Sequence, residues 1–327
     1  MDAIGRRTLM AGALGAFAAL LASSARAQQW GDPPTPYAPG PNMPAWPPAE
    51  HFPLWPGRPP GAPDTLPTLA PTMNGPHDRR ELWLRGIAAP MLAVFRPERP
   101  DGRALLIIPG GGYNFVSVHN EGIDVASTLT PHGITCFVLA YRLPGEGWAN
   151  RADVALQDAQ RAMRLIRARA ATWRIDPAKL GLVGFSAGGH LGLSLAVGHG
   201  DRVYAPLDAA DQLSARPAYA GIAYPAVHGF PPFWGNDPSA DVQARYTTIP
   251  RIGAEMPPMF LFHAMDDPVV PIQNSLDLIA AARANHVPVE AHLFASGGHG
   301  FGALHLPEQS SGRMWPEMFA RWTAAQG

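Results

Sequence analysis

A serine lies between two glycines in the pentapeptide Gly184-Phe185-Ser186-Ala187-Gly188. It follows the apolar run 180–185, which is typical of a buried strand, and it opens a predicted amphipathic helix through Gly189, Leu191 and Leu195. In a sharp strand-to-helix turn the flanking glycines avoid side-chain clashes, and the serine hydroxyl stands above the sheet edge. The spacing predicts a nucleophile at Ser186, against the alternative of a tight turn with an incidental serine.

A second glycine-rich segment, Pro109-Gly110-Gly111-Gly112-Tyr113, follows the apolar run 105–108. Three successive glycines can turn backbone N–H groups into a cavity, where they stabilise the oxyanion of a tetrahedral intermediate. A phosphate-binding loop is the alternative, but neither G-x-G-x-x-G nor a following G-K-[ST] is present. A plain turn stays open as the third reading.

A serine nucleophile needs a histidine to take its proton and a carboxylate to orient that histidine. Asp266 and Asp267 follow the apolar run 259–263, and His299 follows the last predicted strand, at 289–294. All of these groups come just after strands, where parallel sheets place their functional sites. The chain order Ser, Asp, His suits a triad of this kind.

The other histidines have less suitable positions. Among the twelve histidines, His299 alone lies in a glycine-rich loop after the final predicted strand. His305 is the fallback base, His263 ends a strand and is expected to pack or to form hydrogen bonds, and His190 lies on the helix after Ser186, where it can line the site. No histidine pair with a carboxylate at metal-ligand spacing stands out, so the sequence predicts no metal.

The elements around these groups alternate between strands and helices. Apolar runs predict strands at 105–108, 134–141, 180–185, 218–224, 259–263 and 289–294, and one or two edge strands at 81–96. Amphipathic spacing predicts helices at 151–173, 272–285 and 311–325. This alternation predicts an α/β fold with a mostly parallel sheet and helices on both faces. The stretch 225–258 breaks the rhythm and is expected to be a short aromatic-rich insertion near the site.

Composition limits the class of protein. The chain has 327 residues, of which 46% are hydrophobic and 16% charged, enough apolar material for a sizeable core. The net charge of −1 gives no basic excess for binding nucleic acid. The single cysteine, Cys136, excludes an internal disulfide and a cysteine zinc cluster.

The first 27 residues are predicted to be a signal peptide. Arg6-Arg7 precede an uncharged apolar run from Leu9 to Leu21, which is too short to span a bilayer, and Ala25-Arg26-Ala27 resembles a cleavage site. The paired arginines indicate a twin-arginine signal, with an ordinary secretory signal as the alternative. The protein is therefore expected to be exported to the periplasm or beyond, with no membrane span in the mature chain.

Residues 28–78 are predicted to form a proline-rich segment before the catalytic domain at 79–327. Fifteen prolines lie between Pro33 and Pro71, which excludes a helix or a central strand there. Trp30, Trp46 and Trp55 favour a strap that packs on the globular body, against a solvated linker.

The stretch from about 81 to 325 resembles the α/β-hydrolase superfamily, and within it small bacterial serine esterases related to acetylxylan esterases and the hormone-sensitive-lipase group. The segments that carry the resemblance are P-G-G-G-Y at 109–113, A-Y-R-L at 140–143, D-A-Q-R-A-M-R-L-I-R at 158–167, D-P-A-K-L-G-L-V-G-F-S-A-G-G-H-L at 176–191, D-P-V-V-P at 267–271 and G-G-H-G-F at 297–301. The resemblance implies an α/β-hydrolase fold and a carboxylic ester hydrolase without a cofactor.

The resemblance also assigns roles. It makes Ser186 the nucleophile, His299 the general base and Asp267 the triad carboxylate, with Asp266 as the runner-up. The N–H groups of Ala187 and of Gly111 or Gly112 would form the oxyanion hole. Lipase-like relatives have histidine where this chain has Pro109, which leaves open which glycine N–H points inward.

The substrate is expected to be a short-acyl ester, an acetyl ester of a carbohydrate such as acetylated xylan. Candidate pocket residues are Tyr113, Trp148, His190 and Trp234, and the insertion also carries Phe230, Phe233 and Tyr246. A general short-chain carboxylesterase is the main alternative. An exported serine peptidase or a non-catalytic binding module of the same fold are further alternatives.

Overall fold

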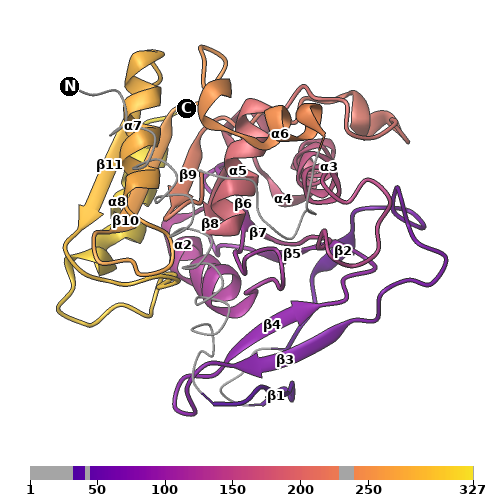
Figure 1. Cartoon of the computed structure of the whole chain (residues 1–327), viewed down its shortest axis with the longest axis horizontal. Coiled ribbons are helices and arrows are strands. Elements are labelled where there is room, and N and C mark those ends of the chain that lie inside the picture. Colours follow the sequence, from indigo (N-terminus) through magenta and orange to yellow (C-terminus); the bar gives the residue numbers. More distant parts are fainter. Residues whose placement is uncertain (1–31, 41–44, 228–238, 327) are drawn as a thin grey trace, which may run out of the picture.

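The computed structural model describes residues 32–40, 45–227 and 239–326. The predicted signal peptide, Trp30 and the insertion residues Phe230, Phe233 and Trp234 lie outside these ranges. Within them, the main sheet has eight strands in the order β11-β10-β9-β8-β6-β7-β5-β2 (Figure 1). The strands are β2 (His51–Pro53), β5 (Met91–Phe95), β6 (Ala104–Ile108), β7 (Thr135–Ala140), β8 (Leu180–Phe185), β9 (Ala220–Ala223), β10 (Met259–Ala264) and β11 (Val289–Phe294).

The sheet is parallel from β7 to β11, and only β5 and β2 run antiparallel to their neighbours. The central strand β6 is buried on both faces. Leu106 and Ile108 contact one apolar core, and Leu105 and Ile107 contact the other. This two-residue alternation confirms the prediction of a mostly parallel sheet that is covered on both sides.

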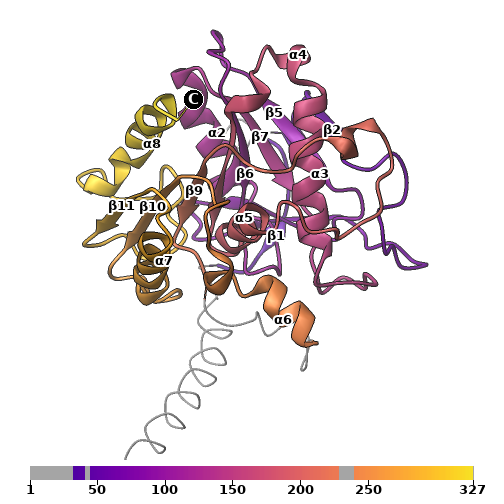
Figure 2. The same cartoon turned by 90° about the horizontal axis from the view of Figure 1, so that it is seen from above.

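Helices cover the two faces (Figure 2). One core contains residues of α3, α5 and α7, whereas the opposite core contains residues of α2 and α8. The helices of the described residues are α2 (Asp124–Leu129), α3 (Val154–Ala168), α4 (Ala170–Trp173), α5 (Ala187–Val197), α6 (Ala240–Tyr246), α7 (Gln273–Ala284) and α8 (Trp315–Ala324). The single helix expected over 151–173 is wrong, because Arg169 leaves the helical conformation and separates α3 from α4.

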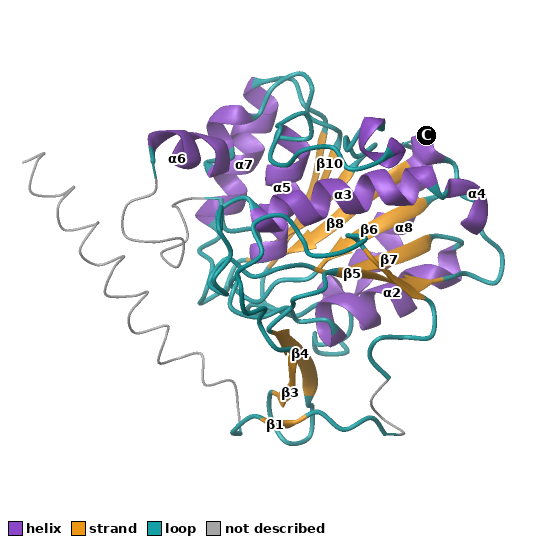
Figure 3. Ribbon diagram, turned by 90° about the vertical axis from the view of Figure 1, so that its right-hand side faces the viewer, coloured by secondary structure: helices purple, strands orange, loops and turns teal. Residues whose placement is uncertain are grey.

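The expectation of edge strands at 81–96 is also wrong in part. β4 (Glu81–Arg85) leaves the main sheet and pairs with β3 (Ala70–Asn74), which in turn pairs with β1 (Thr35–Pro36) (Figure 3). β5 is covered by β2, so β2 is the edge strand. An edge position tolerates the missing N–H of Pro53, and this explains how a proline-rich segment joins the sheet.

The proline-rich segment is also held by a buried polar contact. Trp55 is buried, and its Nε1 donates to Asp158 Oδ1 at 2.7 Å. The same carboxylate forms an ion pair with Arg142 at 2.8 Å, and both of these side chains are inaccessible to solvent. On the same helix, Arg161 is also buried, and it pairs with Asp208 and Asp211. The residues around Trp55 therefore pack on the body as a strap.

Replacing Trp55 with phenylalanine is expected to lower the free energy of unfolding by about 1–3 kcal/mol, because it removes a donor from a buried carboxylate. Urea unfolding of the purified protein measures this change. Trp322→Phe is the matched control, because Trp322 is only half-buried. Equal losses in the two variants would contradict a specific role for the contact between Trp55 and Asp158.

Candidate active site

Ser186 lies at the turn between β8 and α5, in a strained backbone conformation with φ 52° and ψ −117°. The turn is too tight for side chains at its glycines: a Cβ on Gly184 would lie 2.2 Å from the carbonyl oxygen of Gly188, and a Cβ on Gly188 would lie 2.1 Å from that of Ile108. A non-glycine residue at positive φ costs free energy and is retained where the surroundings enforce it. The turn therefore holds the Ser186 hydroxyl at the carboxyl end of the sheet.

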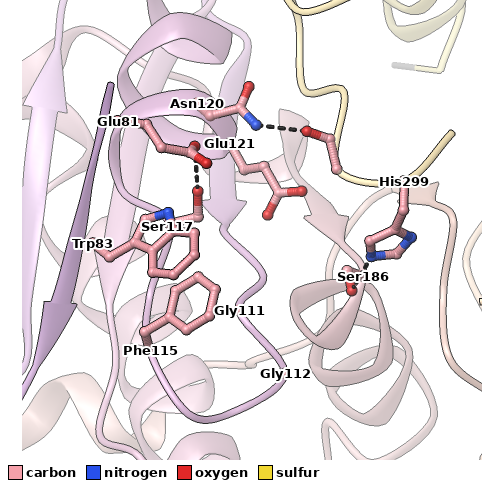
Figure 4. Close-up of a pocket in the computed structure, with 11 residues that line it drawn as sticks. Glu81, Trp83, Gly111, Gly112, Phe115, Ser117, Asn120, Glu121, Ser186 and His299 are labelled. Atoms are coloured by element: carbon pink, nitrogen blue, oxygen red, sulfur yellow. Dashed lines mark hydrogen bonds between the residues drawn. The ribbon is translucent and has the colours of Figure 1, made fainter. Parts of the chain in front are cut away.

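Three side chains form a hydrogen-bonded row at this edge. His299 Nε2 lies 2.8 Å from Ser186 Oγ, and His299 Nδ1 lies 2.7 Å from Asp267 Oδ2. The contact between His299 and Ser186 is visible in Figure 4. Because a carboxylate only accepts hydrogen bonds, His299 donates from Nδ1, and its Nε2 accepts from the serine hydroxyl. This arrangement can transfer a proton from Ser186 to His299.

The two neighbouring aspartates have different partners. Asp267 Oδ1 accepts from the N–H groups of Val269 and Val270, each at 2.8 Å, while Oδ2 faces His299. Asp266 instead accepts from the backbone N–H groups of 297 and 298 and so braces the loop that carries His299. The structure thus places Asp267, the predicted triad member, against the imidazole of His299, and Asp266 against the backbone of the loop that carries His299.

The pKa of Asp267 reflects two opposing effects. Burial by itself raises this pKa, but hydrogen bonds from His263 and His299 lower it by more than burial raises it. The net result is a pKa lowered to about 2. The carboxylate is therefore ionised at neutral pH and can stabilise a protonated imidazole.

The glycine-rich loop passes directly beside the serine. A Cβ on Gly110 would lie 3.0 Å from Ser186 Cβ, and Gly111 and Gly112 have φ of 124° and 58°. In the described part of the chain, the N–H groups of Gly111, Gly112 and Ala187 have no hydrogen-bond partner. They are available as donors to an oxyanion, whereas Gly110 donates its N–H to Glu121 Oε2 at 2.7 Å.

Sequence reasoning missed Glu121. This side chain is buried, and its Oε1 accepts from the hydroxyl of Tyr224 at 2.8 Å. Tyr224 in turn accepts from the N–H of Gly302 and packs its ring 5.0 Å from that of His299. Burial raises the pKa of Glu121 above its ordinary value. Glu121 thereby links the glycine-rich loop to the loop of His299. This link braces the glycine-rich loop, which in this chain begins with Pro109 instead of the histidine of lipase-like relatives.

Three of the predicted pocket residues do not line the cleft beside Ser186. Tyr113 and His190 are buried, with the Tyr113 hydroxyl 2.8 Å from His190 Nδ1, and they anchor the glycine-rich loop to α5. Trp148 is buried against the guanidinium of Arg142, at 4.9 Å from ring centroid to Cζ. These three side chains pack inside the protein, so their assignment to the substrate pocket is corrected to a packing role. The fourth residue, Trp234, lies outside the described residues.

The cleft beside Ser186 encloses about 390 Å³, including solvent at its mouth. One wall consists of the stacked rings of Trp83 and Phe115, which the sequence did not single out. Other lining groups are polar (Figure 4): Glu81, Ser117, Asn120 and Glu121. The fallback base His305 lines an adjacent hollow, and the imidazole bonded to Ser186 is that of His299.

Glu81 is expected to make stability depend on pH. Burial, reinforced by the nearby Glu121 carboxylate, raises the pKa of Glu81 to about 7. The folded protein therefore binds this proton more tightly than the unfolded chain, and stability falls as the pH rises from about 4.5 to 7. Glu81→Gln is expected to raise the free energy of unfolding by roughly 3 kcal/mol at pH 8 and by little at pH 4. Denaturation at both pH values measures this, and parallel curves for the two proteins would contradict it.

Comparisons with known proteins find a matching family model and curated relatives that are named as enzymes of xylan. A family model described as BD-FAE matches residues 92–217. The acetylxylan esterase of Xylanibacter ruminicola is 30% identical over 224 residues, which are 64% of this chain and 43% of that protein. Endo-1,4-beta-xylanase B of Butyrivibrio fibrisolvens is 31% identical, over 60% of this chain and 32% of that protein. The chain thus spans less than half the length of these curated relatives.

Solved structures show the same likeness. The acetyl ester-xyloside bifunctional hydrolase of Caldicellulosiruptor lactoaceticus has a TM-score of 0.67 at 26% identity, over 84% of this chain and 96% of that one. MGS-M1, an alpha/beta hydrolase enzyme from a Medee basin deep-sea metagenome library, has a TM-score of 0.56 at 26% identity, over 72% of this chain and 92% of that one. These findings confirm the predicted fold and the predicted resemblance.

Proposed function

We propose that this chain, which has the α/β-hydrolase fold and resembles acetylxylan esterases, is a serine esterase that removes short acyl groups, above all acetyl, from carbohydrates. The names of its relatives support a carboxylic ester hydrolase. The observation that carries the proposal is the row of hydrogen bonds that joins Ser186, His299 and Asp267.

The proposed reaction has two steps. Ser186 Oγ attacks the ester carbonyl while His299 takes its proton, and Asp267 stabilises the resulting imidazolium. The N–H groups of Ala187 and of Gly111 or Gly112 stabilise the oxyanion. The alcohol then leaves with the proton from His299, and a water molecule activated by His299 cleaves the acyl-enzyme.

A panel of esters tests the substrate class. The purified protein is expected to release acetate from acetylated xylan and to hydrolyse p-nitrophenyl acetate faster than the butyrate. A fluorophosphonate should label Ser186, which separates an enzyme from a binding module. Failure to label, together with no hydrolysis of any ester, would refute the proposal.

A general short-chain carboxylesterase is the second candidate. The stacked rings of Trp83 and Phe115 support it, because an apolar wall suits the hydrocarbon chain of an acyl group. In that case the butyrate ester is hydrolysed as fast as the acetate ester, and acetylated xylan releases no acetate.

Export through the twin-arginine route is part of the proposal and is supported by Arg6-Arg7 and the Ala25-Arg26-Ala27 sequence. Replacing both Arg6 and Arg7 with lysine should leave the precursor in the cytoplasm, whereas the unchanged leader should deliver the mature protein to the periplasm. Unchanged export of the double-lysine variant would favour the ordinary secretory route.

A further inference from the structure

His263, at the end of β10, lies behind the carboxylate of Asp267. Its ring is fully buried, and both ring nitrogens have partners. Nε2 lies 3.0 Å from Asp267 Oδ2 and 3.1 Å from the carbonyl oxygen of Val270, and Nδ1 lies 2.7 Å from the hydroxyl of Ser275 on α7. The sequence had indicated only a packing or hydrogen-bonding residue at this position.

We infer that His263 is a positioning residue, which holds the carboxylate of Asp267 in the orientation that His299 needs. The inference rests on the proposed function, because it concerns the same triad. Its basis is that two imidazoles converge on one carboxylate oxygen, Oδ2 of Asp267.

The partners determine the hydrogen-bond directions around His263. Asp267 Oδ2 and the carbonyl oxygen of Val270 both accept, so Nε2 carries the proton and donates. When Ser275 donates its hydroxyl proton to Nδ1, one ring proton satisfies every contact of His263. With that proton placement the donor carries no charge, so it fixes the carboxylate without cancelling the charge that stabilises a protonated His299.

The remaining contacts of Asp267 complete its fixation. Its Oδ1 accepts from two backbone N–H groups, so the carboxylate receives four donors. The ring of Tyr224 packs against both imidazoles, at 5.0 Å from His299 and 6.3 Å from His263. Among the described residues, the titratable groups that face Asp267 are His263, His299 and Tyr224, and the Glu121 carboxylate also acts electrostatically on His299. Without His263, the carboxylate loses one of its four donors and can rotate away from His299.

Variants at His263 test the inference. His263→Leu removes the donor, and His263→Gln keeps an N–H that can reach Asp267. The control is His292→Leu, which removes a partly buried histidine that pairs with Glu290 on the adjacent strand β11. We expect His263→Leu to lower kcat by on the order of 10- to 100-fold with KM within about twofold, and His263→Gln to restore most of the loss.

The pH profile separates positioning from a merely structural role. In His263→Leu the Asp267 carboxylate is no longer held towards His299 and stabilises its protonated form less, so the acid limb of kcat/KM should move to lower pH, whereas the control should match the wild type. Wild-type kcat and an unmoved acid limb in His263→Leu would overturn the inference. A glutamine variant as impaired as the leucine variant would also overturn it, because ring shape rather than the N–H would then matter.

Ser275→Ala covers the case in which His263→Leu does not fold. This change leaves His263 in place but removes the partner of Nδ1, and it should lower kcat by about 3- to 10-fold. In that case a Ser275→Ala protein with wild-type kcat would sink the inference. Failure of the proposed function is distinguishable, because it would appear as a wild type that hydrolyses no ester or as full activity in Ser186→Ala. Failure of this inference leaves the wild type active and Ser186→Ala inactive.

Discussion

Ser186→Ala is expected to lower kcat for p-nitrophenyl acetate by on the order of 10⁴- to 10⁶-fold, because it removes the hydroxyl that the strained turn holds against His299. Substrate binding and the oxyanion donors are retained, so a small residual rate over the uncatalysed reaction is expected. Steady-state hydrolysis and fluorophosphonate labelling measure the loss.

The strained backbone at Ser186 supplies a control for folding. Its φ of 52° is unfavourable for serine and alanine but not for glycine. Ser186→Gly should therefore be as inactive as Ser186→Ala yet more stable by about 1 kcal/mol. Unfolding of both variants in urea checks that lost activity does not come from lost structure. An active, well-folded Ser186→Ala protein would refute Ser186 as the nucleophile.

The second large effect is expected at the paired aspartates. Asp267→Asn should lower kcat by about 10³- to 10⁴-fold, because an amide that donates to His299 Nδ1 favours the wrong tautomer. Asp266→Asn should cost less than about tenfold, because an amide oxygen can still accept from the backbone of 297 and 298. Kinetics of the two variants on one substrate decides the assignment, and a reversed order of effects would make Asp266 the triad member.

Stability should follow the same assignment. The pKa of Asp267 is lowered to about 2, so its ionised form contributes stability above about pH 4, and this contribution is lost as the pH falls towards 2. At pH 7, Asp267→Asn should therefore be less stable than the wild type by roughly 2 kcal/mol, and the difference should shrink between pH 4 and pH 2. A difference that is constant across this range would contradict the lowered pKa.

Much of the fold was predictable from local patterns. Apolar runs and amphipathic spacing identified the strands β6 to β11 and the helices α7 and α8, because burial on a sheet face or a helix stripe demands such periodicity. Position within the sheet was less predictable. No local pattern in 81–96 indicates that β4 belongs to the small three-stranded sheet. Nor does any indicate that the proline-rich segment supplies β2, the edge strand of the main sheet.

The sequence alone determined that a serine, a glycine-rich loop, an aspartate pair and a histidine would meet at one edge of a parallel sheet. Each of these groups directly follows an apolar run, and parallel strands end at the same edge of their sheet. Their catalytic roles stay predictions. Only the tertiary structure decided which aspartate faces His299, that Glu121 braces the loop after Pro109, and that Trp148 serves packing rather than the cleft. These outcomes depend on side-chain directions and burial between segments far apart in the chain, and no local pattern records them.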